Sequence, residues 1–509
     1  MENTLDVPPN PHRSTAGAQS RIYHCGTLTY TRQQLAKLFF WLLWGDFCFI
    51  LMETVVPSIL PLKFKALGTP DTSIGLIMVT IPMLLNTVFN PVISFRSDRF
   101  RSRWGRRIPF ILCTLPLLVF CLIAIGYADS FGFWLHRVMG AALARFSPNQ
   151  VATCAIGAFM IFFSFFNTFV NSVFWYLFND VVPQNLLARF MSWQRTVSQV
   201  STSLYYLLIF RFAGTHFHAI FIGTGIIYVL GFGLMCFNVK EGEYPPAPEN
   251  LNGKSGLFSA IKTFGAECHS HSLYWYTFLS TTFASLALCI TPFMYFFYQE
   301  TGLNLDQIGF VLGSISITSA ILILGSGWLA DRYHPFRVVI AGYTMQLFLV
   351  LPATSIWLFW HPASGMVFKA WLIISIGLTA PAAALIGVCD PPLLMRIFSR
   401  ERYGQFCAAN AMWRSAGAIV GGWLAGFFLV TLKHYTGTTA VYRYIPVWQI
   451  ACYIPVLYCT IKQFQYWKSC GGDRAYAPPL PEGWQGGEPG SSIINEKCRS
   501  REAAAPLEY

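Results

Sequence analysis

Long apolar runs of roughly 20 residues divide this chain, and they limit its fold more than any other feature. A run of that length spans the hydrocarbon core of a bilayer as a helix. Hydrophobic residues occupy 54% of the 509 positions and charged residues only 11%, whereas a typical soluble domain is about 25% charged. We therefore predict an all-α integral membrane protein that crosses the bilayer many times.

The runs number about twelve, six on either side of a polar interior stretch. They lie at Leu35–Leu60, Ile74–Ile93, Ile108–Tyr127, Val151–Phe178, Met191–Phe212, Ala219–Phe237, Leu273–Tyr298, Ile308–Ala330, Phe336–Trp360, Trp371–Val388, Gln405–Leu432 and Tyr444–Phe464. This pattern predicts two six-helix bundles, 34–238 and 273–466, joined by a linker, 239–272. The first 33 residues form a predicted N-terminal tail, and residues 467–509, rich in Gly, Pro and Glu, a predicted disordered tail.

Charge sets the expected orientation. The loop from Ser94 to Phe110 holds six arginines between the second and third runs, and arginine-rich loops stay on the cytoplasmic side. Lys and Arg gather on every second loop, so both termini are predicted to be cytoplasmic. The outside loop 128–150 fits least well, because it carries Arg137 and Arg145. Its partly helical spacing predicts an amphipathic helix at the membrane surface.

The two halves of the chain echo one another at three matching positions. Asp98-Arg99 follows the second run and Asp331-Arg332 the eighth; Asp180 follows the fourth and Asp390 the tenth; Trp193-Gln194-Arg195 opens the fifth and Trp413-Arg414 lies early in the eleventh. Three echoes in register indicate a duplicated bundle, a common architecture of transporters.

With twelve spans in two sixes, and Asp98-Arg99 through Gly105-Arg106-Arg107 between spans two and three, the chain resembles the major facilitator superfamily over 35–464. The form Ser97-Asp98-Arg99, then Ser102-Arg103-Trp104-Gly105-Arg106-Arg107 and Pro109-Phe110, is similar to the sucrose-transporter-like and glycoside-pentoside-hexuronide:cation symporter branch. This resemblance implies a secondary transporter that works by alternating access. It also implies a substrate cavity between the bundles and a sugar or glycoside as cargo.

One departure from that branch bears on ion coupling. Cation symporters of the branch place carboxylates in spans two and four, but span two here has none, and span four has none before Asp180. Sodium coupling through that arrangement is therefore in doubt. Coupling must then depend on Asp46, or the protein is a uniporter.

The arginine loop also predicts a gate. Gly105 allows a tight turn, and Asp98 can pair with arginines near the next helix to hold the inner side closed. The predicted gate residues are Asp98, Arg99, Gly105, Arg106, Arg107 and their echoes Asp331 and Arg332. The alternative is that these arginines serve topology alone.

Two carboxylates lie within the first run. Asp46 and Glu53 are seven residues apart, close to two helical turns, so they are expected to share a face. Ionisable groups within spans are costly and mark candidate functional sites, and a buried carboxylate can take up a proton near neutral pH. We predict Asp46, and secondarily Glu53, as coupling residues. A structural ion pair, for instance with Arg195 or Arg414, is the alternative.

Polar residues recur every four positions along span four. Asn167, Asn171, Trp175 and Asn179 form this stripe. Amides donate and accept hydrogen bonds, and an aromatic ring packs on a sugar face, so the stripe is a candidate sugar-binding surface. Hydrogen bonding between helices is the competing interpretation. Arg195, Asn410 and Arg414 are further candidate substrate residues, although each arginine could instead extend to interfacial water.

Several function classes are disfavoured. The chain has no Cys-x-x-Cys pair, no His/Cys spacing suited to zinc and no Gly-x-x-x-x-Gly-Lys-Ser/Thr loop, so no metal site and no other cofactor is predicted. The histidines form no catalytic pattern, so an enzyme is not expected. Topology explains the net charge of +12, so nucleic acid is not an expected partner.

The expected partners are a small solute, a co-transported proton or cation, and the lipid bilayer. A monomer is expected, because one pair of bundles already encloses a cavity. Two other functions stay open: a proton-coupled exporter of amphipathic organic compounds, which the 17% aromatic content would suit, and a transporter-like receptor that moves no cargo.

Overall fold

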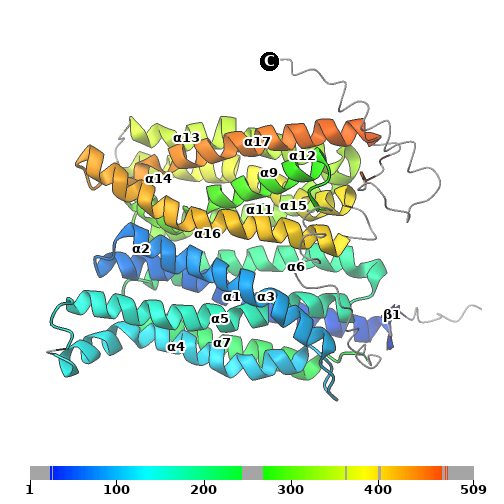
Figure 1. The fold of residues 1–509 in the computed structure, drawn as a ribbon, viewed down its shortest axis with the longest axis horizontal. Helices are drawn as coiled ribbons and strands as arrows, with labels where there is room; N and C mark the ends of the chain where they lie inside the picture. The colour runs from blue at the N-terminus through cyan, green and yellow to red at the C-terminus, as the bar shows by residue number, and fades with distance from the viewer. Residues whose placement is uncertain are drawn as a thin grey trace, which may run out of the picture.

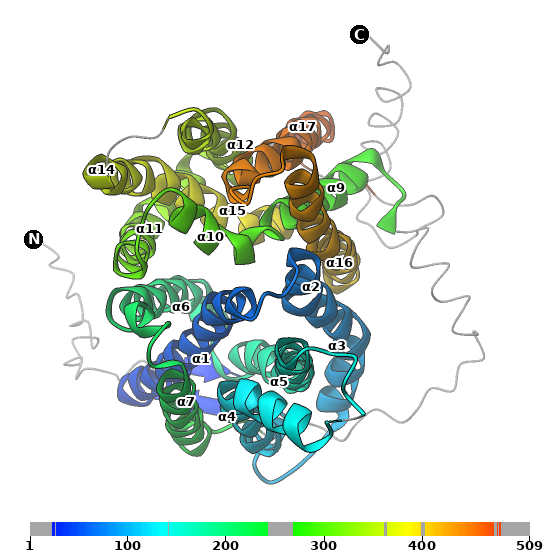
Figure 2. The same cartoon turned by 90° about the vertical axis from the view of Figure 1, so that its left-hand side faces the viewer.

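Helices make up nearly all of the described chain, which in this computed structural model comprises residues 23–25, 27–140, 142–242, 268–360, 364–398, 403–472, 476 and 478–479. Figure 1 shows the helices as two stacked layers with their axes roughly parallel, the N-terminal half below and the C-terminal half above. Seen end-on in Figure 2, each layer is a separate bundle of helices. The predicted division into two bundles is thus visible in the fold.

The N-terminal bundle follows a short hairpin of strands β1 (Tyr23–Cys25) and β2 (Leu28–Tyr30), paired antiparallel with Tyr23 opposite Tyr30. Its helical segments are α1 (Arg32–Ala66), α2 (Asp71–Gly75), η1 (Leu76–Thr80), α3 (Ile81–Arg99), α4 (Ile108–Val138), α5 (Pro148–Val181), α6 (Gln184–Leu204), η2 (Tyr205–Ile209), η3 (Phe210–Phe212) and α7 (Phe217–Asn238). The segments α2, η1 and α3 run on as one rod, as do α6, η2 and η3.

The C-terminal bundle repeats this plan. Its segments are α9 (Ser272–Leu288), η4 (Thr291–Phe293), α10 (Met294–Glu300), α11 (Leu305–Tyr333), α12 (Pro335–Met345), η5 (Gln346–Val350), α13 (Leu351–Ser355), η6 (Ile356–Leu358), α14 (Ser364–Ile374), η7 (Ser375–Thr379), α15 (Ala380–Ile397), α16 (Tyr403–Thr436), η8 (Tyr442–Tyr444) and α17 (Ile445–Ser469). We call the end of the molecule with the loop 100–107 the arginine end, and the end with α2 the opposite end.

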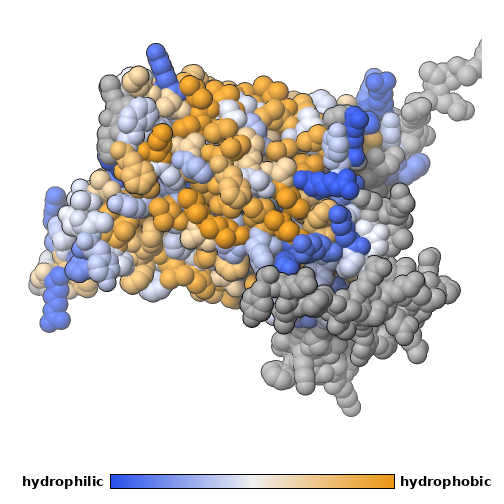
Figure 3. Space-filling view, turned by 90° about the horizontal axis from the view of Figure 1, so that it is seen from above, coloured by the Kyte–Doolittle hydropathy of each residue, from blue (hydrophilic) through white to orange (hydrophobic). Residues whose placement is uncertain are grey.

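Eleven helical rods among the described residues are long and apolar enough to cross a membrane. Figure 3 shows the matching surface, an apolar band with polar side chains toward both ends. The chain is therefore an integral, multi-pass, all-α membrane protein, as predicted. The orientation of its termini relative to the cytoplasm stays a prediction.

The expected fifth span, 191–212, is not among the eleven. It corresponds to α6 with η2 and η3, and α6 is rich in polar residues that bond within the protein. Ser201 Oγ donates to the Phe47 carbonyl of α1 at 2.8 Å, and Ser203 Oγ donates to the Gly313 carbonyl of α11 at 2.9 Å. A helix whose polar groups are satisfied by neighbours on both sides can be less apolar than one that faces lipid.

Two segment predictions need correction. Residues 128–138, predicted to belong to a separate surface helix, continue α4, which ends at Val138, and α5 begins at Pro148. The predicted tail also starts too early. Helix α17 reaches Ser469, Trp467 is 2% exposed, and Tyr274 Oη donates to the Pro479 carbonyl at 2.8 Å. Apolar packing of Trp467 and this hydrogen bond hold residues that composition alone assigned to the tail.

The other predictions for the tails and the linker concern residues that lie mostly outside the described chain. Residues 1–22, 243–267 and 480–509 lie outside the described residues. Within the predicted N-terminal tail, the hairpin of β1 and β2 is a feature that sequence reasoning missed. It leads directly into α1, where Thr31 and Gln34 form a reciprocal capping box, a common way to fix the start of a helix.

Candidate functional site

A polar cavity of about 210 Å³ lies inside the N-terminal bundle, between α1, η1, α3 and α5. Its polar lining comprises Glu53, Asn86, Ser164, Asn167, Thr168 and Asn171, and methionine, proline, valine and phenylalanine side chains complete the wall. The cavity therefore combines one carboxylate and three amides with an apolar surround, the usual make-up of a small-molecule site.

Glu53 and Asn167 are in direct contact within this cavity. Asn167 Nδ2 donates to Glu53 Oε1 at 2.5 Å. Asn167 Oδ1 is buried and has no hydrogen-bond partner in the described part of the chain. A buried acceptor without a partner is costly unless something else satisfies it, so this oxygen marks an unmet hydrogen-bonding requirement at the wall of the cavity.

The structure brings together part of the predicted stripe on α5. Asn167 and Asn171 line the cavity, with Ser164 and Thr168 beside them. Trp175 lies beyond the cavity, 37% exposed, with its ring 5.6 Å from that of Phe178. The side chain of Asn179 lies outside the described residues.

Sequence reasoning missed Asn86, which α3 adds to the same cavity. Asn90 follows one helical turn later, and its buried Oδ1 also has no partner among the described residues. Asn86 and Asn90 are four residues apart within an apolar run. This is the same pattern as the polar stripe on α5, and it could have predicted that α3 also lines a polar site.

Asp46 occupies a second, separate position. It is 1% exposed and accepts hydrogen bonds from Gln194 Nε2 and Ser198 Oγ of α6, both at 2.7 Å. Both donors are neutral, and the alternative interpretation, an ion pair of Asp46 with Arg195, is not seen between these two described side chains. The predicted two-turn spacing does not create one site either, because Asp46 faces α6 whereas Glu53 faces α5.

Arg195 instead links the two bundles. Its Nη1 donates to the Gly387 carbonyl of α15 at 3.0 Å, and Asp390, one turn further along α15, is near enough to act on Arg195 electrostatically. Arg414 is exposed. It lies in the same region, because Arg414 and Asp390 are both near enough to Tyr343 to interact with it electrostatically. Asn410 lies elsewhere: its Oδ1 accepts from Thr281 Oγ1 at 2.7 Å, a bond between α16 and α9.

The arginine loop is held by partners that the sequence did not reveal. Asp180, at the end of α5, accepts from Arg106 Nε at 3.0 Å, Arg106 Nη2 at 2.6 Å and Arg107 Nε at 3.0 Å. Glu241, just after α7, accepts the backbone N–H groups of Arg106, Arg107 and Ile108 at 3.0, 2.8 and 2.7 Å. Glu241 thereby caps the N-terminus of α4, where a negative charge is favourable.

Gly105 makes the tight turn that its sequence context predicts. Its φ is +102°, and a Cβ at this position would lie 2.5 Å from the Glu241 side chain. Only glycine combines this backbone conformation with so close an approach. The turn thus brings the loop backbone onto Glu241.

The remaining gate residues are described only in part. The side chains of Asp98, Arg99 and Asp331 lie outside the described residues, so the predicted pairing of Asp98 stays a prediction. The Arg332 guanidinium lies 5.6 Å from the centre of the Tyr333 ring.

The N-terminal hairpin reaches the same region. Cys25 Sγ donates to the carbonyl oxygens of Asp180 and Val182 at 3.4 and 3.5 Å. Burial, and to a smaller extent the charge of Asp180, raise the pKa of the Cys25 thiol. The thiol is therefore a neutral donor that ties β1 to the end of α5.

We expect Asp180→Asn to destabilise the protein. Arg107 is only 5% exposed and Arg106 19% exposed in their pairs with Asp180, and removing one partner of a buried ion pair costs about 3 kcal/mol or more. Thermal unfolding in detergent micelles should occur several degrees lower than in the unaltered protein. Asp306→Asn, an exposed carboxylate on α11, is the control. Equal stability of both variants would show that Asp180 does not brace the loop.

At the opposite end, the two bundles touch through a polar cluster. Tyr442 Oη donates to Asp71 Oδ1 at 2.7 Å, Lys65 Nζ lies 3.2 Å from the same oxygen, and Lys65 also contacts Tyr442. Lys65 and Asp71 belong to the N-terminal bundle and Tyr442 to the C-terminal bundle. The cluster therefore joins the bundles at this end.

Glycines allow the helices to approach beside this cluster. A Cβ on Gly422 of α16 would lie 2.6 Å from Thr80 Oγ1, and one on Gly426 would lie 2.5 Å from the Asp71 carbonyl oxygen. A Cβ on Gly309 of α11 would lie 2.5 Å from the Tyr206 carbonyl oxygen of η2. Figure 2 shows the two pairs of neighbouring helices, α2 with α16 and α6 with α11, on either side of the bundle interface.

Comparison with known proteins identifies the architecture. The family model described as Major Facilitator Superfamily matches residues 42–422. The nucleoside transporter NupG has a similar structure, with a TM-score of 0.60, 11% identity and coverage of 84% of this chain and 100% of NupG. For the xylose transporter XylE from E. coli the TM-score is 0.53, the identity 10% and the coverage 83% of this chain and 95% of XylE.

Two curated relatives match in sequence. The membrane-associated transporter protein of Mus musculus is 24% identical over 240 residues, 43% of this chain and 42% of that protein. Solute carrier family 45 member 4 of Homo sapiens is 24% identical over 277 residues, 51% of this chain and 34% of that protein. The match thus spans less than half the length of either relative.

Proposed function

Because this chain belongs to the major facilitator superfamily and is a membrane transporter of that type, we propose that it moves a small polar solute, a sugar or a glycoside, together with a proton. The proposed mechanism is alternating access. The matching relatives are a membrane-associated transporter protein and a member of solute carrier family 45, and they do not test the resemblance to the glycoside-cation branch. That resemblance supports only the proposed class of cargo.

The polar cavity of the N-terminal bundle is the observation that carries this proposal. Glu53, Asn86, Asn167 and Asn171 offer donors and acceptors around one space, and sugar hydroxyls need both. The volume of about 210 Å³ is below the roughly 300–1,000 Å³ of pockets for drug-sized ligands. Its size and polarity favour a small hydroxylated solute over a bulky amphipathic one.

Asp46 is the proposed proton site. A carboxylate inside a membrane helix that is held only by neutral donors pays a high cost for its charge, and binding a proton removes that cost. Glu53 is also held by a neutral donor, Asn167, but that contact lies in the wall of the polar cavity, so we assign Glu53 to solute binding. The two carboxylates of α1 would thus divide coupling and binding between them.

The contacts at the opposite end support alternating access. In this mechanism the bundles separate at one end while they close at the other. The cluster of Lys65, Asp71 and Tyr442 and the glycine contacts describe a state that is closed at the opposite end. Transport would require these contacts to break and re-form in every cycle.

Uptake into proteoliposomes tests the proposed binding site. Pentoses, hexoses, glycosides and nucleosides form a suitable panel of solutes. For a transported solute, we expect Asn171→Ala to raise the apparent KM about 2- to 10-fold, because it removes about one neutral hydrogen bond. Asn238→Ala is the matched control, since that amide bonds to the Leu234 carbonyl at the end of α7.

Three results would contradict the proposal. An unchanged KM in Asn171→Ala would show that the solute does not bind in this cavity. Outward, proton-driven movement of amphipathic compounds with no response to sugars would favour the exporter. Saturable binding of a solute without any transport would favour the receptor.

A further inference from the structure

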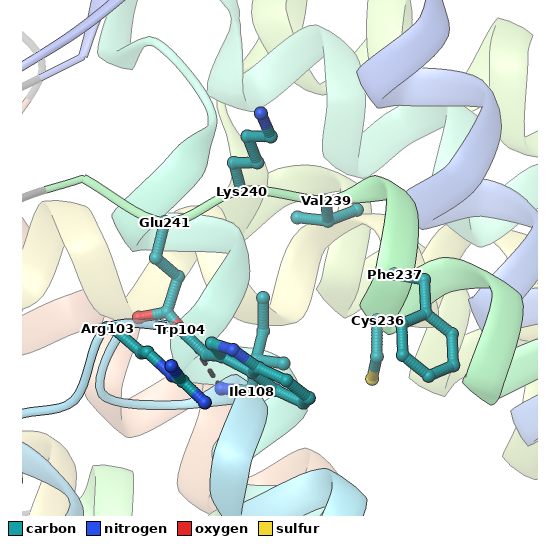
Figure 4. Close-up of a pocket in the computed structure, with 8 residues that line it drawn as sticks. All are labelled: Arg103, Trp104, Ile108, Cys236, Phe237, Val239, Lys240 and Glu241. Atoms are coloured by element: carbon teal, nitrogen blue, oxygen red, sulfur yellow. Dashed lines mark hydrogen bonds between the residues drawn. The ribbon is translucent and has the colours of Figure 1, made fainter.

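A second cavity, of about 400 Å³, opens at the arginine end between the arginine loop and the end of α7. Figure 4 shows Arg103, Trp104 and Ile108 on one side and Cys236 and Phe237 on the other, with Val239, Lys240 and Glu241 along the rim and the Lys240 side chain pointing away from Arg103. It shares no residue with the polar cavity inside the bundle. Nothing in the proposed transport mechanism uses it.

This cavity straddles the ends of two membrane spans. Ile108 opens the span of α4, and Cys236 and Phe237 close the span of α7, whereas Arg103, Trp104 and Lys240 lie outside both spans. One half of the cavity is therefore lined by the ends of two candidate membrane spans, and the other half by residues that lie just outside those spans.

An exposed apolar track leads from the cavity along α7. Leu230, Leu234 and Phe237 are 57%, 45% and 70% exposed, and their spacing of four and three residues places them on one helical face. Figure 2 shows α7 and α4 at the outer margin of the N-terminal bundle, away from the C-terminal bundle. The track is thus on a lipid-facing side and can hold an acyl chain.

The other half of the cavity is suited to a phosphate. Arg103 and Lys240 are both exposed, and the Trp104 ring stands 6.4 Å from that of Phe237, in edge contact. Glu241 is the one carboxylate in the lining. Both its oxygens accept backbone N–H groups at the N-terminus of α4, and the positive end of that helix offsets its charge.

We propose that this cavity binds one anionic phospholipid, with its phosphate at Arg103, with the exposed Lys240 side chain turning in from the rim as a second cation, and with an acyl chain along Leu234 and Phe237. Basic pockets between helices on the cytoplasmic side are suited to anionic headgroups, and the arginine loop predicts that this end is cytoplasmic. Bound lipid would bridge the arginine loop and the segment after α7. It would thereby stabilise the contact of Glu241 with α4.

Thermal unfolding of the purified, delipidated full chain in mixed micelles tests this proposal. Dioleoyl-phosphatidylserine should raise the unfolding temperature, whereas dioleoyl-phosphatidylcholine and inorganic phosphate at equal concentration should not. Since each surface cation contributes about a factor of five to binding of an anionic lipid, the double variant Arg103→Gln/Lys240→Gln should need about thirtyfold more phosphatidylserine for the same shift.

A double variant at the opposite end, Lys369→Gln/Lys433→Gln, is the matched control. It removes two exposed lysines and should respond to phosphatidylserine like the unaltered chain. An equal loss of response in both double variants would show nonspecific charge and overturn the proposal. An equal shift with phosphatidylcholine, or one reproduced by inorganic phosphate, would do the same. Both double variants should unfold at the same temperature in phosphatidylcholine, because all four side chains are exposed.

Discussion

Replacing Asp46 with asparagine is expected to abolish proton-driven accumulation of solute while the protein stays folded. The side chain keeps its shape, and an amide oxygen still accepts from Gln194 Nε2, which lies 2.7 Å from Asp46 Oδ1. The amide cannot bind and release a proton, however. A difference of one pH unit is worth about 1.4 kcal/mol per proton, or about tenfold accumulation, so the accumulation ratio should fall from about 10 to about 1.

The measurement compares net accumulation under a proton gradient with solute exchange at equal pH. Asp46→Asn should lose the first and retain the second within a few-fold. Glu53→Gln provides the contrast, because Glu53 lies in the polar cavity with Asn167: it should keep accumulation and raise KM. If Asp46→Asn accumulates solute like the unaltered protein, coupling at Asp46 is wrong. If both variants and the unaltered chain only equilibrate solute, the protein is a uniporter.

Features that depend on local pattern could be predicted from the sequence. The apolar runs predict helices in the right places, because burial in lipid needs only length and composition. The four-residue spacing of Asn167 and Asn171 places them on one face of α5, and both line the polar cavity. Gly105 was recognisable as a turn because it stands among arginines between two apolar runs, and its φ of +102° confirms the turn.

Contacts between distant segments could not be predicted in the same way. Gln194 lies 148 positions from Asp46, and Glu241 lies 135 positions from Arg106. These pairs depend on which helices pack together and at what rotation. For the same reason, the sequence did not reveal that Asp46 contacts α6 whereas Glu53, on the same helix, contacts α5. It also did not reveal that the polar groups of α6 form hydrogen bonds with the neighbouring helices.

Replacing Gly422 with leucine is expected to stop transport by preventing closure at the opposite end. A Cβ on Gly422 would already lie 2.6 Å from Thr80 Oγ1, 2.8 Å from Val79 Cβ and 2.9 Å from the Thr80 backbone nitrogen. Val79 Cβ and the Thr80 nitrogen do not move when a side chain rotates, so the contact cannot relax by a rotamer change. Since interiors this tight do not accept extra methylenes, α16 must move away from η1. A transporter that cannot close one end cannot complete a cycle.

Hydrogen–deuterium exchange locates the effect. In Gly422→Leu, amides of 71–80 and 417–436 should exchange faster, while those of α4 and α5 stay as in the unaltered protein, and uptake should fall to the background of empty liposomes. Gly377→Leu is the matched control, because no atom lies within 4 Å of a Cβ at that position; it should leave exchange and uptake unchanged. Gly422→Ala provides a milder step if the leucine variant does not fold, and should lower uptake partly. Full uptake in Gly422→Ala, together with unaltered exchange at 71–80, would show that close contact of α16 with η1 is not part of the transport cycle.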